Sequence, residues 1–364
     1  MHKSAAWPLA WLYAGLVVYA SCYPFADWRD QGIAPWEFLF APMARYWTGF
    51  DVGINVVGYI PLGGLLTLGA LRNRRSRHPV LWAVVFGTLL SLTMEAMQSY
   101  LPSRVPSRED FLLNAWGTAL GASAALLLEH LGAIDRWSQV RARWFVPHSR
   151  GGLVLLALWP AALLFPAPVP LGLGQVMERL EQGVADGLQD TPYLHWLPTH
   201  ANALTPLAPG TEMLCVALGL LIPCLLGFCI VRPLMRRLAL VVMLALLAVA
   251  VTALSAALSW GPGHAWAWLD LPAQTGLALG AVLALGLAFV PWRGGAALAL
   301  VALGLYISLL NQAPESPYFA QTLQEWEQGR FIRFHGLAQW LGWFWPYGAL
   351  VYLLAQLGRR GEEN

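Results

Sequence analysis

A polar stretch joins two apolar segments of this chain: residues 94–121 read MEAMQSYLPSRVPSREDFLLNAWGTALG. It begins at the end of one apolar run and ends inside the next. Ionisable and amide side chains lie in or beside those runs, namely Glu95, Gln98, Arg104, Asp110 and Asn114. A charged side chain inside a membrane segment is costly unless it is paired or protonated, so such residues mark a candidate functional site.

The composition of the whole chain indicates a membrane protein. Of its 364 residues, 57% are hydrophobic and only 12% are charged, whereas soluble globular chains carry about 25% charged residues. The 19 Trp and 11 Tyr residues suit interfacial aromatic belts. The net charge of +2 gives no reason to expect a nucleic-acid partner. The four cysteines show no CxxC pair and no Cys/His metal spacing, so we expect no disulfide framework, no metal and no cofactor.

Apolar runs long enough to cross a bilayer, about 17–25 residues each, predict about ten transmembrane helices in an all-α polytopic bundle. They lie at 7–25, 51–71, 80–100, 110–131, 151–167, 211–231, 237–259, 272–291, 294–311 and 336–357. The part of the first run up to Cys22 resembles a signal peptide or a lipoprotein site. Its single Lys3, and Tyr19 three positions before the cysteine, favour an uncleaved helix instead.

The distribution of basic residues predicts the orientation. With ten helices and a cytoplasmic N-terminus, fifteen of the 22 Lys and Arg residues fall in cytoplasmic loops. This excess follows the positive-inside rule and predicts that both termini are cytoplasmic. We therefore expect a multi-pass protein of the plasma (inner) membrane.

Loop lengths predict the domain organisation. Residues 1–131 form a four-helix unit, 132–150 a basic cytoplasmic linker, and 151–364 a six-helix extension. The extension carries long extracytoplasmic loops at 168–210 and 312–335. Within these loops we expect surface helices at 174–188 and 317–335.

Spacing places the polar residues of the first unit on facing helix surfaces. Thr88, Ser91, Glu95 and Gln98 recur every three or four positions, as do Asp110, Asn114, Gly117 and Gly121. The short linker between the two helices makes them antiparallel neighbours, and the two glycines permit close approach. Asn55 on the second helix lies near the same outer level. These residues therefore predict one polar cluster near the outer membrane surface.

Two interpretations of this cluster remain open. As a functional site, Glu95 and Asp110 are the acid–base candidates, and Asn55, Gln98, Arg104 and Asn114 are the binding candidates. Arginine can hold a phosphate headgroup in a bidentate manner. Alternatively, amides and carboxylates on facing helices act as interhelical contacts worth about 0.6–2 kcal/mol each. Ser107, three residues before Asp110, has the spacing of a helix N-cap.

The combined motifs resemble the VanZ-like family of membrane proteins. The matching elements are NVVGYIPLGG at 55–64, EAMQ at 95–98, LPSR at 101–104, and DFLLNAWGTALG at 110–121, with YPF at 23–25. The resemblance covers about residues 15–131 and implies a four-helix unit. It also implies that Pro61, Gly63, Gly117 and Gly121 are structural motif residues. The name-giving member is associated with resistance to teicoplanin, a lipid-bearing glycopeptide that targets peptidoglycan precursors.

Three functions fit the sequence. The first is binding or processing of a membrane lipid or a lipid-linked cell-envelope precursor. The second is a non-catalytic scaffold, or a protein that binds a lipid or a drug. The third is transport, for which the second half offers only neutral polar residues, among them Thr252, Ser255 and Ser259.

Overall fold

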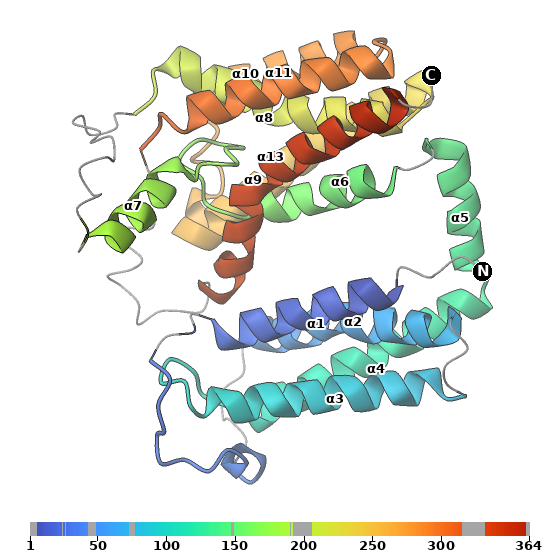
Figure 1. Cartoon of the computed structure of the whole chain (residues 1–364), viewed down its shortest axis with the longest axis vertical. Coiled ribbons are helices and arrows are strands. Elements are labelled where there is room, and N and C mark those ends of the chain that lie inside the picture. Colours follow the sequence, from blue (N-terminus) through green and yellow to red (C-terminus); the bar gives the residue numbers. More distant parts are fainter. Residues whose placement is uncertain are drawn as a thin grey trace. The chain divides into compact units, whose positions relative to one another are not determined.

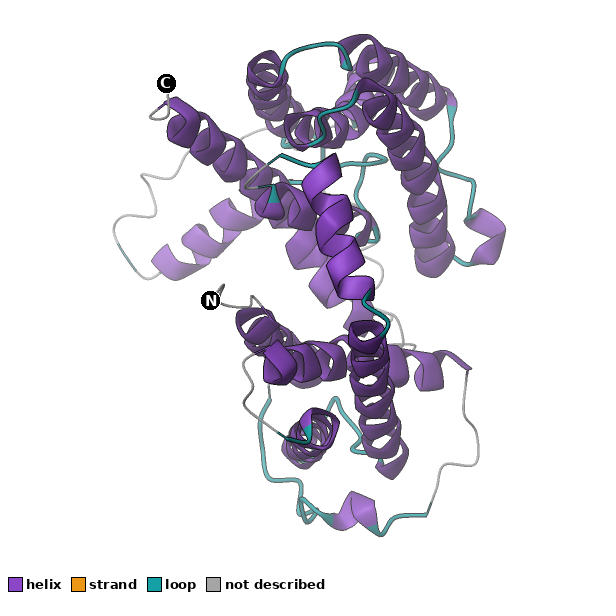
Figure 2. Ribbon diagram, turned by 90° about the vertical axis from the view of Figure 1, so that its right-hand side faces the viewer, coloured by secondary structure: helices purple, strands orange, loops and turns teal. Residues whose placement is uncertain are grey.

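The computed structural model describes residues 6–23, 25, 27–42, 49–72, 77–146, 149–189, 191, 206–314 and 332–361. The chain divides into two compact units, Met1–Val140 and Arg141–Asn364, called here the N-terminal and C-terminal units. Within the described ranges the regular secondary structure is helical and contains no strand (Figure 2). The predicted all-α class is therefore confirmed.

Four long helices build the N-terminal unit: α1 (Ala6–Cys22), α2 (Gly49–Arg72), α3 (Pro79–Gln98) and α4 (Arg108–His130). A short 3-10 helix, Glu37–Leu39, lies between α1 and α2. Helix α2 packs against each of the other three (Figure 1). Its Tyr59, Leu62 and Leu66 form a buried core with small residues of the neighbouring helices, namely Ala10, Ala14, Ala83 and Ala122.

The closest helix pair in this unit is α2 with α4, because glycines stand where the two backbones meet. A Cβ on Gly117 would collide with the carbonyl oxygen of Val56, and one on Gly121 with that of Ile60. From the other side, a Cβ on Gly63 would collide with the carbonyl oxygen of Thr118. These motif glycines therefore set the distance at which α4 lies on α2.

Helix α5 (Ala133–Trp144) follows α4. Its basic and its apolar residues each recur at helical spacing, so the helix is amphipathic. Most of the predicted basic linker, residues 132–150, is therefore helical.

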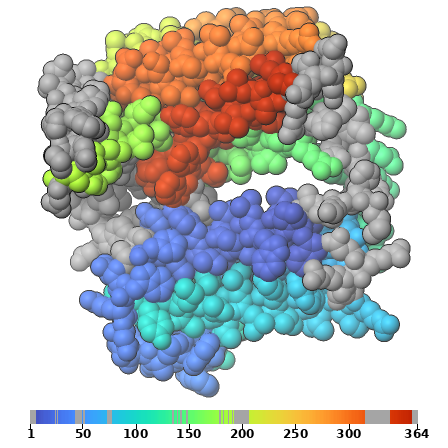
Figure 3. All heavy atoms as spheres, in the orientation of Figure 1, coloured from blue at the N-terminus to red at the C-terminus, as the bar shows by residue number. Residues whose placement is uncertain are grey.

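The C-terminal unit surrounds one buried helix, α8 (Pro209–Ile230). Every residue of α8 from Cys215 to Ile230 is buried, as expected of a helix that is apolar on all sides. Its neighbours are α6 (Arg150–Leu163), α9 (Leu234–Trp260), α10 (Leu271–Leu287) and α11 (Trp292–Leu310). In the space-filling view α13 (Ile332–Gly361) lies along α11 and α6 (Figure 3). The unit also contains α7 (Met177–Leu188) and a 3-10 helix, Pro262–His264.

A buried irregular segment follows α6. This helix has 14 residues, about 21 Å at 1.5 Å per residue, which is shorter than the hydrocarbon core of a bilayer. The chain then continues without helix, with Val169, Leu171 and Leu173 buried. The Tyr306 hydroxyl donates to the carbonyl of Leu171 and accepts the amide of Leu173. Such backbone is tolerated in a membrane domain where protein covers it. The predicted helix at 151–167 therefore ends early, at Leu163.

Each of the ten predicted apolar runs coincides with a helix, but the helices differ in length. In the described ranges six are long and apolar enough to cross a membrane: α2, α3, α4, α8, α9 and α11. Helices α1, α6 and α10 are shorter apolar helices. The number of crossings and the orientation of the termini remain predictions. The predicted surface helix at 174–188 is present as α7, whereas residues 317–331 of the other predicted surface helix lie outside the described residues.

Candidate functional site

The corner between α3 and α4 folds over a buried carboxylate. Glu95, near the end of α3, is 3% exposed. One of its oxygens accepts the backbone N–H of Ser107 at 2.9 Å. The Ser107 hydroxyl caps α4 by accepting the N–H of Asp110 at 3.2 Å, and it donates to Glu109 at 2.9 Å. The expected N-cap is therefore present, and the carboxylate of Glu95 fixes the loop that precedes it.

Asn55 and Asp110 connect α2 to the start of α4. The side-chain amide of Asn55 donates to Asp110 Oδ1 at 2.7 Å. A short hydrogen bond to a carboxylate is stronger than one between neutral groups. Because Asp110 also lies in the first turn of α4, its negative charge faces the positive end of the helix dipole.

Deeper between α3 and α4, Asn114 pairs with Ser91. The Asn114 amide donates to Ser91 Oγ at 3.0 Å, and both residues are buried. The nearby Tyr59 hydroxyl lies beside the Ser91 side chain and within electrostatic reach of Glu95. Among the described residues, neither the Asn114 Oδ1 atom nor the Tyr59 hydroxyl has a hydrogen-bond partner of normal geometry. The region around Ser91 thus contains an acceptor and a hydroxyl with unused hydrogen-bonding capacity, and elsewhere in the unit Thr67 Oγ1 and Glu129 Oε2 also lack a hydrogen-bond partner among the described residues.

Arg104 and Gln98 bind the end of α1. Arg104 is 6% exposed, and its Nε and Nη2 donate to the carbonyl of Tyr23 at 3.2 and 2.7 Å. Nη2 also donates to the carbonyl of Ala20 at 3.0 Å, and Gln98 donates to the carbonyl of Ser21 at 3.0 Å. The last carbonyls of a helix lack partners within the helix, and a cation there is favourable. Both side chains therefore hold the α1 terminus in place.

The structure brings the predicted residues to one end of the unit, but through different contacts than the sequence implies. Asn55, Asp110, Glu95 and Asn114 connect α2, α3 and α4. Tyr59 was not among the predicted site residues, although it lies one turn after Asn55 on the same helix face. The sequence also does not predict which carbonyls accept from Arg104, because backbone acceptors leave no signal in the residue pattern. Within the described residues no group of three His, Cys, Asp or Glu side chains could hold a metal ion.

The fold and this cluster define a multi-pass helical membrane protein whose N-terminal unit carries a buried polar network. The VanZ/LLP1 family model matches residues 10–129. This part of the chain is therefore a VanZ/LLP1 domain, and the rest is an additional helical extension. Neither the curated proteins nor the solved structures include a match to the chain.

Proposed function

We propose that the N-terminal unit binds the polar part of a membrane lipid or lipid-linked cell-envelope intermediate, at the α3–α4 end and near the outer leaflet of the plasma membrane. One observation carries the proposal: Asn114 Oδ1 is buried without a hydrogen-bond partner among the described residues, and the Tyr59 hydroxyl, which lies near Ser91 and Glu95, forms no hydrogen bond of normal geometry there. An unsatisfied buried polar group costs about 1–3 kcal/mol, and a bound polar ligand removes that cost.

The chemistry of the cluster favours a hydroxyl-rich group, such as the saccharide of a lipid-linked precursor. Carboxylates accept hydrogen bonds from hydroxyls, and side-chain amides both donate to them and accept from them. The described contacts of Arg104, by contrast, are directed to α1 carbonyls, so we do not assign it as the phosphate ligand. Glu95 and Asp110 remain the acid–base candidates for any processing of the bound group. A peptidoglycan precursor as ligand would agree with the teicoplanin resistance associated with the name-giving member of the family.

A second candidate function is a non-catalytic scaffold. The contacts of Arg104 and Gln98 with the α1 terminus favour it, because they stabilise the unit without any ligand. In this case the polar network is interhelical structure throughout.

The two functions differ in what happens when Asn114 and Tyr59 are made apolar. We would purify the full chain with the variants Asn114→Leu and Tyr59→Phe, and with Glu129→Gln as a control near the opposite end of α4. Co-purifying lipids are identified by mass spectrometry, and unfolding is followed in the same samples. Ligand binding predicts that both variants stay folded and lose a lipid species that wild type and the control retain. If the lipid content is identical in all four proteins, the scaffold interpretation holds instead.

A further inference from the structure

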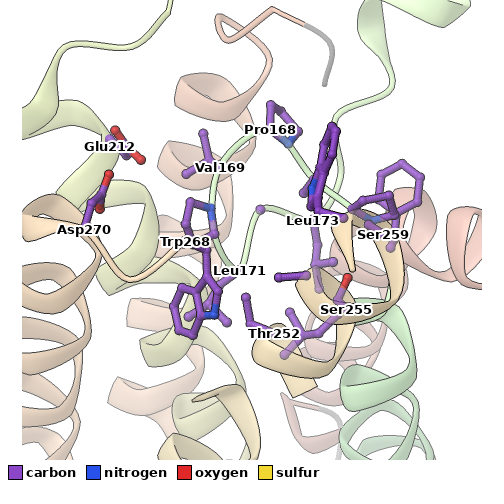
Figure 4. A pocket seen from close by; sticks show the side chains of 18 residues that line it. Pro168, Val169, Leu171, Leu173, Glu212, Thr252, Ser255, Ser259, Trp268 and Asp270 are labelled. Atoms are coloured by element: carbon purple, nitrogen blue, oxygen red, sulfur yellow. The ribbon is translucent and has the colours of Figure 1, made fainter. Parts of the chain in front are cut away.

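A cavity of about 260 Å³ lies inside the C-terminal unit, at the ends of α8, α9 and α10 (Figure 4). Its described walls come from the irregular segment after α6, the last turns of α9, the first turn of α8, and the loop that leads to the N-cap of α10. Helices α8 and α9 are long and apolar enough to span a bilayer, and the cavity lies at their ends, where a spanning helix would reach the headgroup region. The polar cluster of the N-terminal unit plays no part in it.

The cavity is acidic, and none of the described residues in its wall is basic. Glu212, in the first turn of α8, and Asp270, the N-cap of α10, lie side by side in Figure 4 and interact electrostatically. Asp270 Oδ1 accepts the N–H of Ala273 at 2.9 Å. The carboxylate of Glu212 forms no hydrogen bond or ion pair with any residue in the described ranges. Two carboxylates without a cation among the described lining residues create a negative potential that favours a positive ligand.

Aromatic and hydroxyl side chains complete the wall. The indoles of Trp260 and Trp268 line the cavity, and aromatic faces attract organic cations. Thr252, Ser255 and Ser259 recur at helical spacing on α9 and place a hydroxyl stripe along the cavity. Ser255 is used internally, since it donates to the carbonyl of Leu164 at 2.9 Å.

Three polar atoms of the wall have unused hydrogen-bonding capacity. Thr252 Oγ1, Ser259 Oγ and Trp268 Nε1 are buried and have no partner among the described residues. An indole N–H can only donate, and the two hydroxyls can donate after rotation about their Cβ–Oγ bonds. These groups therefore suit hydrogen-bond acceptors on the same ligand that brings the cation. Several such orphaned groups around one cavity call for an occupant, because buried polar groups are normally satisfied.

The irregular segment that closes the cavity is itself strained. Leu171 has φ = 59°, a left-handed conformation that side chains other than glycine rarely adopt. It is held there by Tyr306, which bonds both Leu171 and Leu173. Strained backbone that its surroundings hold in place is concentrated at ligand-binding sites. The segment is therefore held in one defined conformation where it lines the cavity.

We propose that this cavity binds an organic ammonium group that carries hydrogen-bond acceptors, of the kind found in an ethanolamine phosphate headgroup. The ammonium lies between Glu212, Asp270 and the indoles, and the acceptor oxygens face Trp268, Ser259 and Thr252. A bilayer lipid and a free amine share this chemistry, and they differ in whether the phosphate and glycerol parts add affinity.

The test uses the full chain in a neutral detergent and calorimetric titration with three probes: glycerophosphoethanolamine, glycerophosphoglycerol and ethanolamine. Wild type is expected to bind glycerophosphoethanolamine saturably and glycerophosphoglycerol, which lacks the ammonium, at least about tenfold more weakly. Affinity for glycerophosphoethanolamine well above that for ethanolamine identifies a lipid headgroup as the source, and equal affinities identify a free amine.

The variant Glu212→Gln/Asp270→Asn removes both charges while keeping side-chain shape, and asparagine caps a helix as well as aspartate. We expect this variant to keep its unfolding temperature and to bind glycerophosphoethanolamine at least about tenfold more weakly. The double variant Thr252→Val/Ser259→Ala, which removes two hydroxyls, should also weaken binding of glycerophosphoethanolamine. Glu129→Gln in the N-terminal unit should leave this binding unchanged. Equal binding of both glycerophospho probes, undiminished binding by the charge-neutral variant, or no saturable binding by wild type would overturn the proposal.

Discussion

The side-chain amide of Asn55 on α2 donates a 2.7 Å hydrogen bond to the carboxylate of Asp110 at the start of α4. The two residues are 55 positions apart in sequence, and the bond joins the two helices whose backbones approach most closely through Gly117 and Gly121. It lies at the same end of the unit as the loop held by Glu95. The polar network and the glycine contact are therefore parts of one arrangement.

The Asn55–Asp110 bond should appear as a coupling energy. We expect Asn55→Ala and Asp110→Ala each to lower the free energy of unfolding, and the double variant to lose less than the sum. The coupling should be about 1–2 kcal/mol, the usual range for an interhelical bond to a charged group. Denaturant unfolding in detergent of all four proteins measures it. If the losses of the two single variants simply add in the double variant, the bond contributes nothing to stability.

The glycine contact predicts opposite effects for two chemically identical substitutions. Gly117→Ala places a methyl group against the carbonyl of Val56, and backbone cannot move away easily. Its cost should be about 1–3 kcal/mol or more, as for other overpacked sites. Gly58→Ala in α2 meets nothing within 4 Å and should stabilise by up to about 1 kcal/mol through helix propensity. Thermal unfolding of both variants decides the matter, and a stable Gly117→Ala protein would argue against the close approach.

Arg104 and Arg108 lie in the same short corner but differ in environment. Arg104 is buried on the carbonyls of Ala20 and Tyr23, whereas Arg108 is exposed. We expect Arg104→Gln to cost about 2–4 kcal/mol, because it removes several charge-assisted hydrogen bonds. Arg108→Gln should change stability by no more than about 0.5 kcal/mol. Equal small effects in chemical unfolding would mean that Arg104 does not hold the end of α1.

Much of this fold is predictable because it follows from hydrophobicity and helical period. Each apolar run became a helix, and Ser107 caps α4 as its spacing predicts. The polar residues of the first unit gather at one end because helical spacing fixes their faces and a short loop makes α3 and α4 neighbours. Such local rules need no knowledge of tertiary partners.

The parts that escaped prediction depend on backbone partners and on buried irregular chain. Nothing in the residue types shows that Arg104 donates to the carbonyls of α1. Nor does hydropathy show that the apolar run at 151–167 is helical only as far as Leu163, since buried loop and buried helix are equally apolar. The cavity beside that segment has no sequence motif, because its lining residues come from four separate segments of the chain.

Tyr306 should control the irregular segment that follows α6. Its hydroxyl bonds the carbonyl of Leu171 and the amide of Leu173, so Tyr306→Phe leaves two buried backbone groups unsatisfied. We expect a loss of about 2–4 kcal/mol and faster hydrogen exchange at the Leu173 amide, measured by mass spectrometry of peptides covering 165–175. Tyr13→Phe, which removes one bond to the carbonyl of Gly58, is the matched control and should leave that peptide unchanged. Unaltered exchange in Tyr306→Phe would show that packing alone, through Val169 and Leu171, fixes the segment.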